Sequence, residues 1–319
     1  MKQFFSIVFG GLLAIAVGIG IAYGGSLVWK EVRPHLSWFK KTYLTVAQAI
    51  TPTDGTSISG FSRTVRYSAS EEEEILDVAS RSKAPSLFEG ISASGYIIRN
   101  ITRGVTIDER SADRTLPIAS LTKLITAVVA QRSIDPEERV IITRSIMSTY
   151  GNTAQFKIGE TFPAKDLYYP LLMVSSNDAA EALAQAHGRQ KFIEEMNELA
   201  QSIGAYRTYF DDPSGLSPHN ISTAWDMVLI LEWVRTHYPD VIAITTEKTR
   251  VVRAHTWINP THFLNWSTYI GGKNGYIPEA ALTGASLFRL GPNKDIYAVV
   301  VLGSDSRDGD VIKLLEKVN

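Results

Sequence analysis

The stretch PIASLTKLITAVVA, residues 117–130, contains a single lysine in an otherwise almost wholly apolar run. A helix beginning after Pro117 would be apolar on every side, so we predict a buried central helix. The spacing of Ser120 and Lys123 places both side chains on one face of this helix. Burial disfavours the charged form of a lysine, so Lys123 could accept the proton of the Ser120 hydroxyl. The stretch therefore predicts a serine nucleophile that needs no histidine.

Two further strings can supply partners for this pair. Ser175, Ser176 and Asn177 offer a second hydroxyl and an amide at the start of an Ala-rich helical stretch. Lys273 follows two glycines and precedes alternating apolar segments that read as strands. Taken alone, Ser-x-x-Lys is a common string, and a lysine at the end of a helix would explain it. The three strings together favour a catalytic site.

The order and separation of these strings resemble those of serine D-alanyl-D-alanine carboxypeptidases. The chain is similar to low-molecular-weight penicillin-binding proteins of the S11 peptidase family over about residues 90–319. The resemblance is carried by ADRTLPIASLTKLITA (112–127), LLMVSSNDAAEALA (171–184), DDPSGLSPHNISTAWDM (211–227), GGKNGYIPEAALTGAS (271–286) and AVVVLGSDSRD (298–308). It implies a β-lactamase/transpeptidase-like fold with the active site in the cleft between the sheet and a helical subdomain.

The resemblance also implies a role for each motif residue. Ser120 would attack a peptide carbonyl and become acylated, and Lys123 would accept its proton. Ser175 would pass that proton to the departing D-alanine nitrogen, while Asn177 would hold the substrate amide and orient Lys123. Lys273 would lower the pKa of Lys123 further and attract the carboxylate of a C-terminal D-alanine.

The strand around Lys273 contains one departure from the family. The usual Lys-Thr-Gly is here Lys273-Asn274-Gly275, and an asparagine amide is a longer, differently angled donor than a threonine hydroxyl. If this strand lies alongside the serine, the backbone N–H groups of Ser120 and Tyr276 would form the oxyanion hole. Alternatively, the Asn-Gly pair marks a tight type I′ hairpin turn outside any site.

Arg307 lies shortly before the predicted C-terminal helix. Members of the family that the chain resembles can place a carboxylate-binding arginine there. A surface ion pair of Arg307 with Asp305 or Asp308 explains the residue equally well, so both interpretations stay open.

Residues 81–319 are expected to form one catalytic domain, a mixed α/β (α+β) fold. Strand-like runs at about 94–100, 103–109, 282–290 and 296–303 enclose a mainly helical stretch that ends near 240, and a final helix begins near 308. Strands from both ends of the domain imply an antiparallel sheet with flanking helices and an inserted helical subdomain.

The N-terminal region is expected to hold this domain at a membrane. No charged residue occurs between positions 4 and 29, and a bilayer needs only about 20 apolar residues. We predict a transmembrane signal-anchor over 1–30, with the catalytic domain outside the cell membrane, where the expected substrate lies. Cleavage at Ala22-Tyr23-Gly24, giving a secreted enzyme, is the alternative. Residues 31–80 would form a juxtamembrane helix, lying at the membrane surface or equally well packed on the catalytic domain, and a polar, flexible linker.

Composition argues against several other chemistries. The chain has 0 Cys, and its 6 His show no metal-ligand spacing, so we expect neither disulfides nor a metal. No phosphate-binding or dinucleotide-binding glycine motif occurs, so no cofactor is expected. The 32 basic and 33 acidic residues give a net charge of −1, so the chain lacks the excess of positive charge that is typical of proteins that bind nucleic acid.

The expected activity is that of a serine D-Ala-D-Ala carboxypeptidase on peptidoglycan stem peptides, with β-lactam antibiotics as covalent inhibitors. A D,D-endopeptidase or a β-lactamase-like hydrolase is the close alternative. The β-lactamase is disfavoured because Ser175-Ser176-Asn177 lacks a central Asp. A non-catalytic scaffold that binds the cell wall is conceivable because of Asn274.

Overall fold

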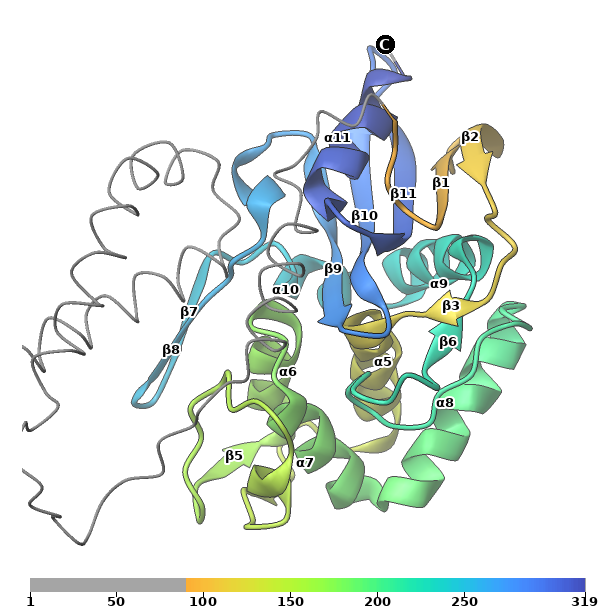
Figure 1. Ribbon diagram of the computed structural model, residues 1–319. Coiled ribbons are helices and arrows are strands. Elements are labelled where there is room, and N and C mark those ends of the chain that lie inside the picture. The colour runs from red at the N-terminus through yellow and green to blue at the C-terminus, as the bar shows by residue number, and fades with distance from the viewer. Residues whose placement is uncertain (1–89, 319) are drawn as a thin grey trace, which may run out of the picture. The chain divides into compact units, whose positions relative to one another are not determined.

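A five-stranded antiparallel sheet forms the centre of the computed structural model, which describes residues 90–318 (Figure 1). Its strand order is β2-β1-β11-β10-β9, so the first and last strands of the domain are neighbours. The strands are β1 (Gly95–Asn100), β2 (Val105–Arg110), β9 (Tyr269–Ile277), β10 (Ala281–Leu290) and β11 (Asp295–Ser304). The predicted antiparallel sheet built from both ends of the domain is confirmed.

Helices cover both faces of the sheet. Helix α11 (Arg307–Glu316) packs on β10 and β11 from one side, and α9 (Ala224–His237) packs on the same strands from the other (Figure 1). Alternate residues of β11 serve the two sides: Val299 and Val301 join the core under α11, whereas Val300 joins the core of the helical region. Burial on both faces explains why β11 is an almost continuous apolar run.

The predicted helical region is inserted between β2 and β9. Its members are η2 (Ala119–Thr122), α5 (Lys123–Ser133), η3 (Ile146–Ser148), α6 (Ala164–Met173), α7 (Asn177–His187), α8 (Arg189–Ile203), α9, α10 (Pro239–Ile244) and η4 (His262–Asn265). Helix α5 is its centre, and every residue from Lys123 to Ala130 is buried. The all-round apolar sequence of this helix is therefore explained by its position.

Several short strands were not expected from the sequence. They are β3 (Leu116–Pro117), β4 (Arg139–Ile141), β5 (Thr161–Pro163), β6 (Ile221–Ser222), β7 (Thr249–Val252) and β8 (His255–Ile258). The hairpin of β7 and β8 lies in a region without a predicted element, and its Trp257 donates to the Ala154 carbonyl over 3.1 Å. A contact so distant in sequence leaves no local pattern.

The predicted membrane anchor (1–30) and the linker (31–80) lie outside the described residues and stay predictions. Within residues 90–318, no helix has the length and apolar character needed to cross a bilayer.

Candidate active site

Ser120 lies in a strained turn rather than inside the helix itself. The 3-10 turn η2 carries it, and the preceding residue Ala119 has a left-handed backbone with φ 49°. The Thr122 hydroxyl holds the turn by donating to the Ala119 carbonyl over 2.7 Å. Non-glycine residues adopt such a conformation at an energetic cost and are often found at functional sites. The turn directs the half-buried Ser120 towards Lys123, the first residue of α5.

Lys123 is fully buried and has three oxygen neighbours. Its Nζ lies 3.0 Å from Ser120 Oγ, 2.8 Å from Asn177 Oδ1 and 2.5 Å from the Ser214 carbonyl oxygen. Burial lowers the pKa of Lys123 from 10.5 to about 7, and the nearby Asp212 carboxylate opposes this shift. A substantial fraction of Lys123 is therefore the neutral amine near neutral pH.

The three oxygen neighbours give the neutral amine a defined orientation. A neutral amine has two N–H bonds and one lone pair, whereas Asn177 Oδ1 and the Ser214 carbonyl can only accept hydrogen bonds. These two acceptors can take both N–H bonds, which leaves the lone pair directed at Ser120 Oγ. The arrangement suits removal of the serine proton.

Asn177 reaches this cluster from the beginning of α7. Ser176 caps that helix by accepting from the Ala179 N–H over 3.1 Å, which fixes the backbone at the point where Asn177 enters the helix. The Asn177 amide donates to the Tyr150 carbonyl over 2.8 Å, so its Oδ1 is left for Lys123. Ser175 is half-buried with φ 58°, and within residues 90–318 no hydrogen bond joins its hydroxyl to the cluster.

Lys273 approaches from β9, the edge strand of the sheet. It pairs in register with Ala285, whose side chain belongs to the core of the helical region, so Lys273 points to that side as well. Its Nζ donates to the Asn274 carbonyl over 2.8 Å. The pKa of Lys273 lies well below its usual value because the side chain is buried and because Lys123 and Arg307 repel its charge.

Glycine at position 275 allows β9 to lie directly against the serine turn. A Cβ atom at Gly275 would lie 2.8 Å from the Ser120 backbone nitrogen and 2.6 Å from Thr283 Oγ1. Both contacts are closer than real Cβ atoms allow, so a larger residue would push the strand away from Ser120. The Asn-Gly pair is in the middle of β9, and the alternative of a hairpin turn there is wrong. Tyr276 follows with a largely exposed side chain.

Asn274 and Arg307 lie on the face of the sheet opposite to that of Lys273. Asn274 pairs with Gly284, and a Cβ atom at Gly284 would come within 2.8 Å of the Arg307 side chain. Arg307 also forms a double hydrogen bond with Asp308, with its Nε 2.7 Å from Oδ1 and its Nη2 3.3 Å from Oδ2. The expected ion pair therefore exists, and the arginine nevertheless lies beside the motif strand.

The loop of residues 211–220 belongs to the site, although sequence reasoning assigned it no role. Its Ser214 carbonyl contacts Lys123, and its Asn220 amide donates to Thr122 Oγ1 over 3.0 Å. Gly215 has φ 84°, and a Cβ atom there would lie only 2.0 Å from the Ala119 carbonyl oxygen. The string DDPSGLSPHN carried the family resemblance, and this was the one available signal for the loop.

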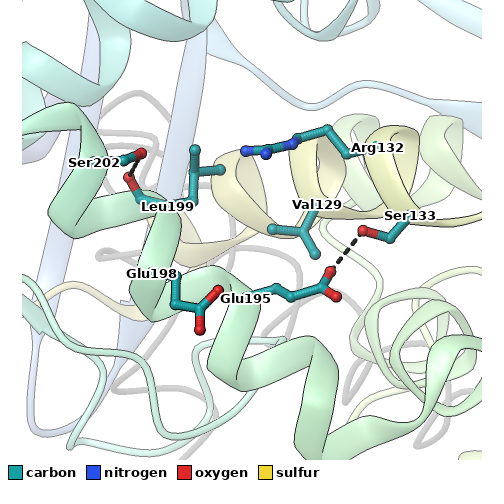
Figure 2. A pocket seen from close by; sticks show the side chains of 7 residues that line it. All are labelled: Val129, Arg132, Ser133, Glu195, Glu198, Leu199 and Ser202. Carbon is teal, nitrogen blue, oxygen red and sulfur yellow. Dashed lines mark hydrogen bonds between the residues drawn. The ribbon is translucent and has the colours of Figure 1, made fainter.

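A separate hollow of about 440 Å³ lies between α5 and α8, where Arg132 and Ser133 form the C-terminal end of α5 (Figure 2). The Ser133 hydroxyl donates to Glu195 across it over 2.6 Å. None of the motif residues lines it. Within residues 90–318, no group of three His, Asp or Glu side chains is placed to hold a metal ion.

Comparison with known proteins identifies the family of the chain. The model of peptidase family S11, described as D-alanyl-D-alanine carboxypeptidase, matches residues 79–304. A D-alanyl-D-alanine endopeptidase of Haemophilus influenzae is 36% identical over 146 residues, which cover 44% of this chain and 50% of the relative. The chain thus spans about half the length of that relative.

Solved structures show the same fold. A D-alanyl-D-alanine carboxypeptidase from Mycobacterium tuberculosis superposes with a TM-score of 0.66 at 25% identity, covering 74% of this chain and 94% of its own. Penicillin-binding protein D2 from Listeria monocytogenes, solved with cefotaxime bound, gives 0.64 at 26% identity and covers 73% and 99%. The expected β-lactamase/transpeptidase-like fold is confirmed, and the chain belongs to the S11 family of serine-type D-alanyl-D-alanine carboxypeptidases.

Proposed function

We propose that this chain is a serine D-Ala-D-Ala carboxypeptidase that acts on peptidoglycan stem peptides through an acyl-enzyme and is acylated by β-lactam antibiotics. The observation that carries the proposal is the fully buried Lys123 amine 3.0 Å from Ser120 Oγ, with acceptors for its N–H bonds on Asn177 and Ser214. This is the arrangement that a lysine base needs.

The proposed reaction has two steps. Ser120 Oγ attacks the carbonyl carbon of the penultimate D-alanine, and its proton passes to Lys123 Nζ. The C–N bond then breaks, the terminal D-alanine leaves with a proton delivered through Ser175, and an ester remains on Ser120. Water next attacks the ester, gives its proton to Lys123, and releases the shortened peptide as the proton returns to Ser120 Oγ. The backbone N–H groups of Ser120 and Tyr276 would bind the oxyanion in both steps.

Two cations would recognise the free carboxylate of the terminal D-alanine. Lys273 lies on the side of Lys123, and Arg307 lies beside Asn274 on the other face of β9, so the carboxylate would bind at the open edge of this edge strand, between the two side chains. A bound carboxylate would raise the pKa of Lys273 again, because a nearby negative charge favours the ammonium. The Asn274 amide would donate to the same carboxylate in place of the threonine hydroxyl of the family.

D,D-Endopeptidase activity is the second candidate, and the Haemophilus influenzae relative named as an endopeptidase supports it. Such an enzyme cuts a cross-link in which D-alanine is joined to a second stem peptide. The acylation chemistry is the same, but the leaving group is larger and the carboxylate contacts are different. The two activities are therefore separated by substrate and not by the identity of the nucleophile.

Three assays on the purified full-length chain test these proposals together. We expect covalent labelling by a fluorescent penicillin, release of D-alanine from a monomeric D-Ala-D-Ala peptide, and slower cleavage of a cross-linked dimer. Faster cleavage of the dimer would identify an endopeptidase, and rapid loss of the label would identify a β-lactamase. If the protein is neither labelled nor able to cleave either substrate, the non-catalytic scaffold is the remaining interpretation.

Substituting Asn274 by threonine tests the departure from the family. We expect Asn274→Thr to increase the rate of acylation by penicillin, because it supplies a short hydroxyl donor to the carboxylate. The gain should be less than one hydrogen bond to a charged group, about 1.5 to 3 kcal/mol, because the amide already supplies part of it. Stopped-flow measurement of acylation would give the change, with Asn274→Ala as the control lacking any donor. A slower Asn274→Thr variant would mean that the pocket is adapted to asparagine.

We also propose that residues 1–30 anchor the enzyme in the cell membrane, with the catalytic domain outside and in reach of peptidoglycan. The uncharged run between positions 4 and 29 supports this proposal. An anchored chain should resist alkaline extraction from membranes and keep its first residues when analysed by mass spectrometry. A mature chain beginning at Gly25 would instead indicate a cleaved signal peptide.

A further inference from the structure

We propose that Asp212 is a positioning residue of this reaction: it holds the Ser214 carbonyl against Lys123 Nζ and places a fixed negative charge near the base. The inference rests on the proposed function, since it concerns how Lys123 is prepared to act. Asp212 is not among the residues to which the family motifs give a role, and its side chain is only 7% exposed.

The Asp212 carboxylate organises the turn that follows it. Its Oδ1 accepts from the Ser214 N–H, the Ser214 hydroxyl and the Gly215 N–H over 2.5, 2.7 and 2.7 Å. Its Oδ2 accepts from the Ser217 N–H over 2.6 Å. With four donors, the carboxylate fixes the direction of the intervening peptide groups, and one of these is the Ser214 carbonyl that contacts Lys123.

Asn220 links the same turn to η2, whose last residue directly precedes the base. Its Oδ1 accepts from the backbone N–H groups of Asp211 and Asp212 over 2.9 and 3.1 Å. Its amide donates to the Asp212 carbonyl over 2.8 Å and to Thr122 Oγ1 over 3.0 Å. The turn therefore cannot shift without disturbing the residue directly before Lys123.

The charge of Asp212 has an effect of its own. It is the carboxylate that raises the pKa of Lys123 against the lowering by burial. Two other charged groups interact with members of this pair. Lys273 on β9 has its own pKa lowered by burial and by Lys123. Arg189 on α8 has its pKa raised by its hydrogen bond to Glu181 and also by Asp212. Arg189 is itself paired with Glu181 of α7 over 2.9 Å. Asp212 is the carboxylate that acts on the pKa of Lys123.

Two consequences of Asp212 can be separated by experiment. Its hydrogen bonds place an acceptor for one N–H of Lys123, which affects the maximal rate of acylation. Its charge stabilises the Lys123 ammonium, which affects the pH at which the base becomes available. A residue that only stabilised the loop would affect neither the pH dependence nor acylation in a variant that folds normally.

The test is the pH profile of penicillin acylation of Ser120 in full-length Asp212→Asn. We expect the plateau rate to fall by roughly tenfold or more, as for the loss of one well-placed hydrogen bond. The acid limb of the profile should move to lower pH than in the wild type, because the ammonium of Lys123 has lost its counter-charge. Asp211→Asn is the matched control: it removes the same charge from the adjacent, exposed side chain.

Asp212→Glu keeps the charge and displaces the carboxylate, so it should lower the plateau and leave the acid limb near its wild-type position. This variant also covers the case in which Asp212→Asn does not fold, as judged by circular dichroism. An acid limb that stays in place or rises in a folded Asp212→Asn, or a profile equal to that of Asp211→Asn, would overturn the inference. Wild-type protein that is not acylated at all would instead contradict the proposed function.

Discussion

Replacement of Ser120 by alanine should abolish both covalent penicillin labelling and D-alanine release, while the chain still folds. The substitution removes one half-buried hydroxyl from η2 and leaves the hydrogen bonds that hold this turn, including that of Thr122 to Ala119, unchanged. Without the nucleophile no acyl-enzyme can form, so turnover should fall by roughly 10⁴-fold to 10⁶-fold.

Mass spectrometry of the penicillin-treated protein provides the measurement. In the wild type, the added mass should map to the peptide that contains Ser120, and it should be absent from Ser120→Ala. Ser175→Ala is a useful control, since it removes a hydroxyl from the same cleft and should still be labelled, though more slowly. Labelling that persists in Ser120→Ala would reveal a different nucleophile and refute the central assignment.

Methionine in place of Lys123 should eliminate acylation almost as completely, because the general base is lost; such a loss is typically about 10²-fold to 10⁴-fold. In the wild type, the pKa of Lys123 near 7 predicts an acid limb of the rate profile in the same region. Acylation should fall about tenfold per pH unit below that value. A wild-type profile that is flat from about pH 6 to 9 would argue against a lysine base.

The same substitution should change how stability depends on pH. Burying the Lys123 ammonium destabilises the wild-type fold below about pH 7, and this penalty disappears as the pH rises towards about 10.5, where the unfolded lysine also loses its proton. The wild type should therefore gain on the order of 4 kcal/mol relative to Lys123→Met across this range. In Lys123→Met, burial still lowers the pKa of Lys273, but the charge of Lys123 no longer does. The variant therefore gains less stability from Lys273 as the pH rises, which increases the difference from the wild type.

Urea unfolding at several pH values would measure this difference. The comparison between pH values is informative, because the loss of hydrogen bonds to Asn177 and Ser214 in the variant is the same at each pH. Parallel stability curves for the two proteins would show that Lys123 has an ordinary pKa, contrary to its complete burial.

Much of the fold and of the central pair could be predicted from local sequence. The apolar run around Lys123 indicates a helix surrounded by protein, and the spacing of Ser120 and Lys123 survives the change from an expected helical turn to a 3-10 turn. In a 3-10 helix, residues i and i+3 are aligned, so the two side chains still meet. The strand pattern of β10 and β11 was equally visible because valines and other apolar residues fill it.

The remaining features depend on contacts between segments that are distant in sequence. The left-handed backbone at Ala119 depends on neighbours such as Gly215, which packs against its carbonyl. No residue close to Ala119 in the sequence indicates this conformation. Asp212 looks like an ordinary loop aspartate until four donors are seen around its carboxylate. Motif letters alone also could not decide whether Asn274 marks a turn or the middle of an edge strand.

The pairing of β1 with β11 has a consequence for how this protein reaches its native state. Gly95 lies opposite Leu302, so β1 can pair only after β11, more than 200 residues later in the chain, has also reached its place in the sheet. Such long-range pairing gives a high contact order, and high contact order slows folding. The serine turn, α7, the 211–220 loop and β9 also meet only in the finished tertiary structure. Reactivity towards penicillin should therefore appear late and all at once during refolding, and the antibiotic would report completion of the native topology.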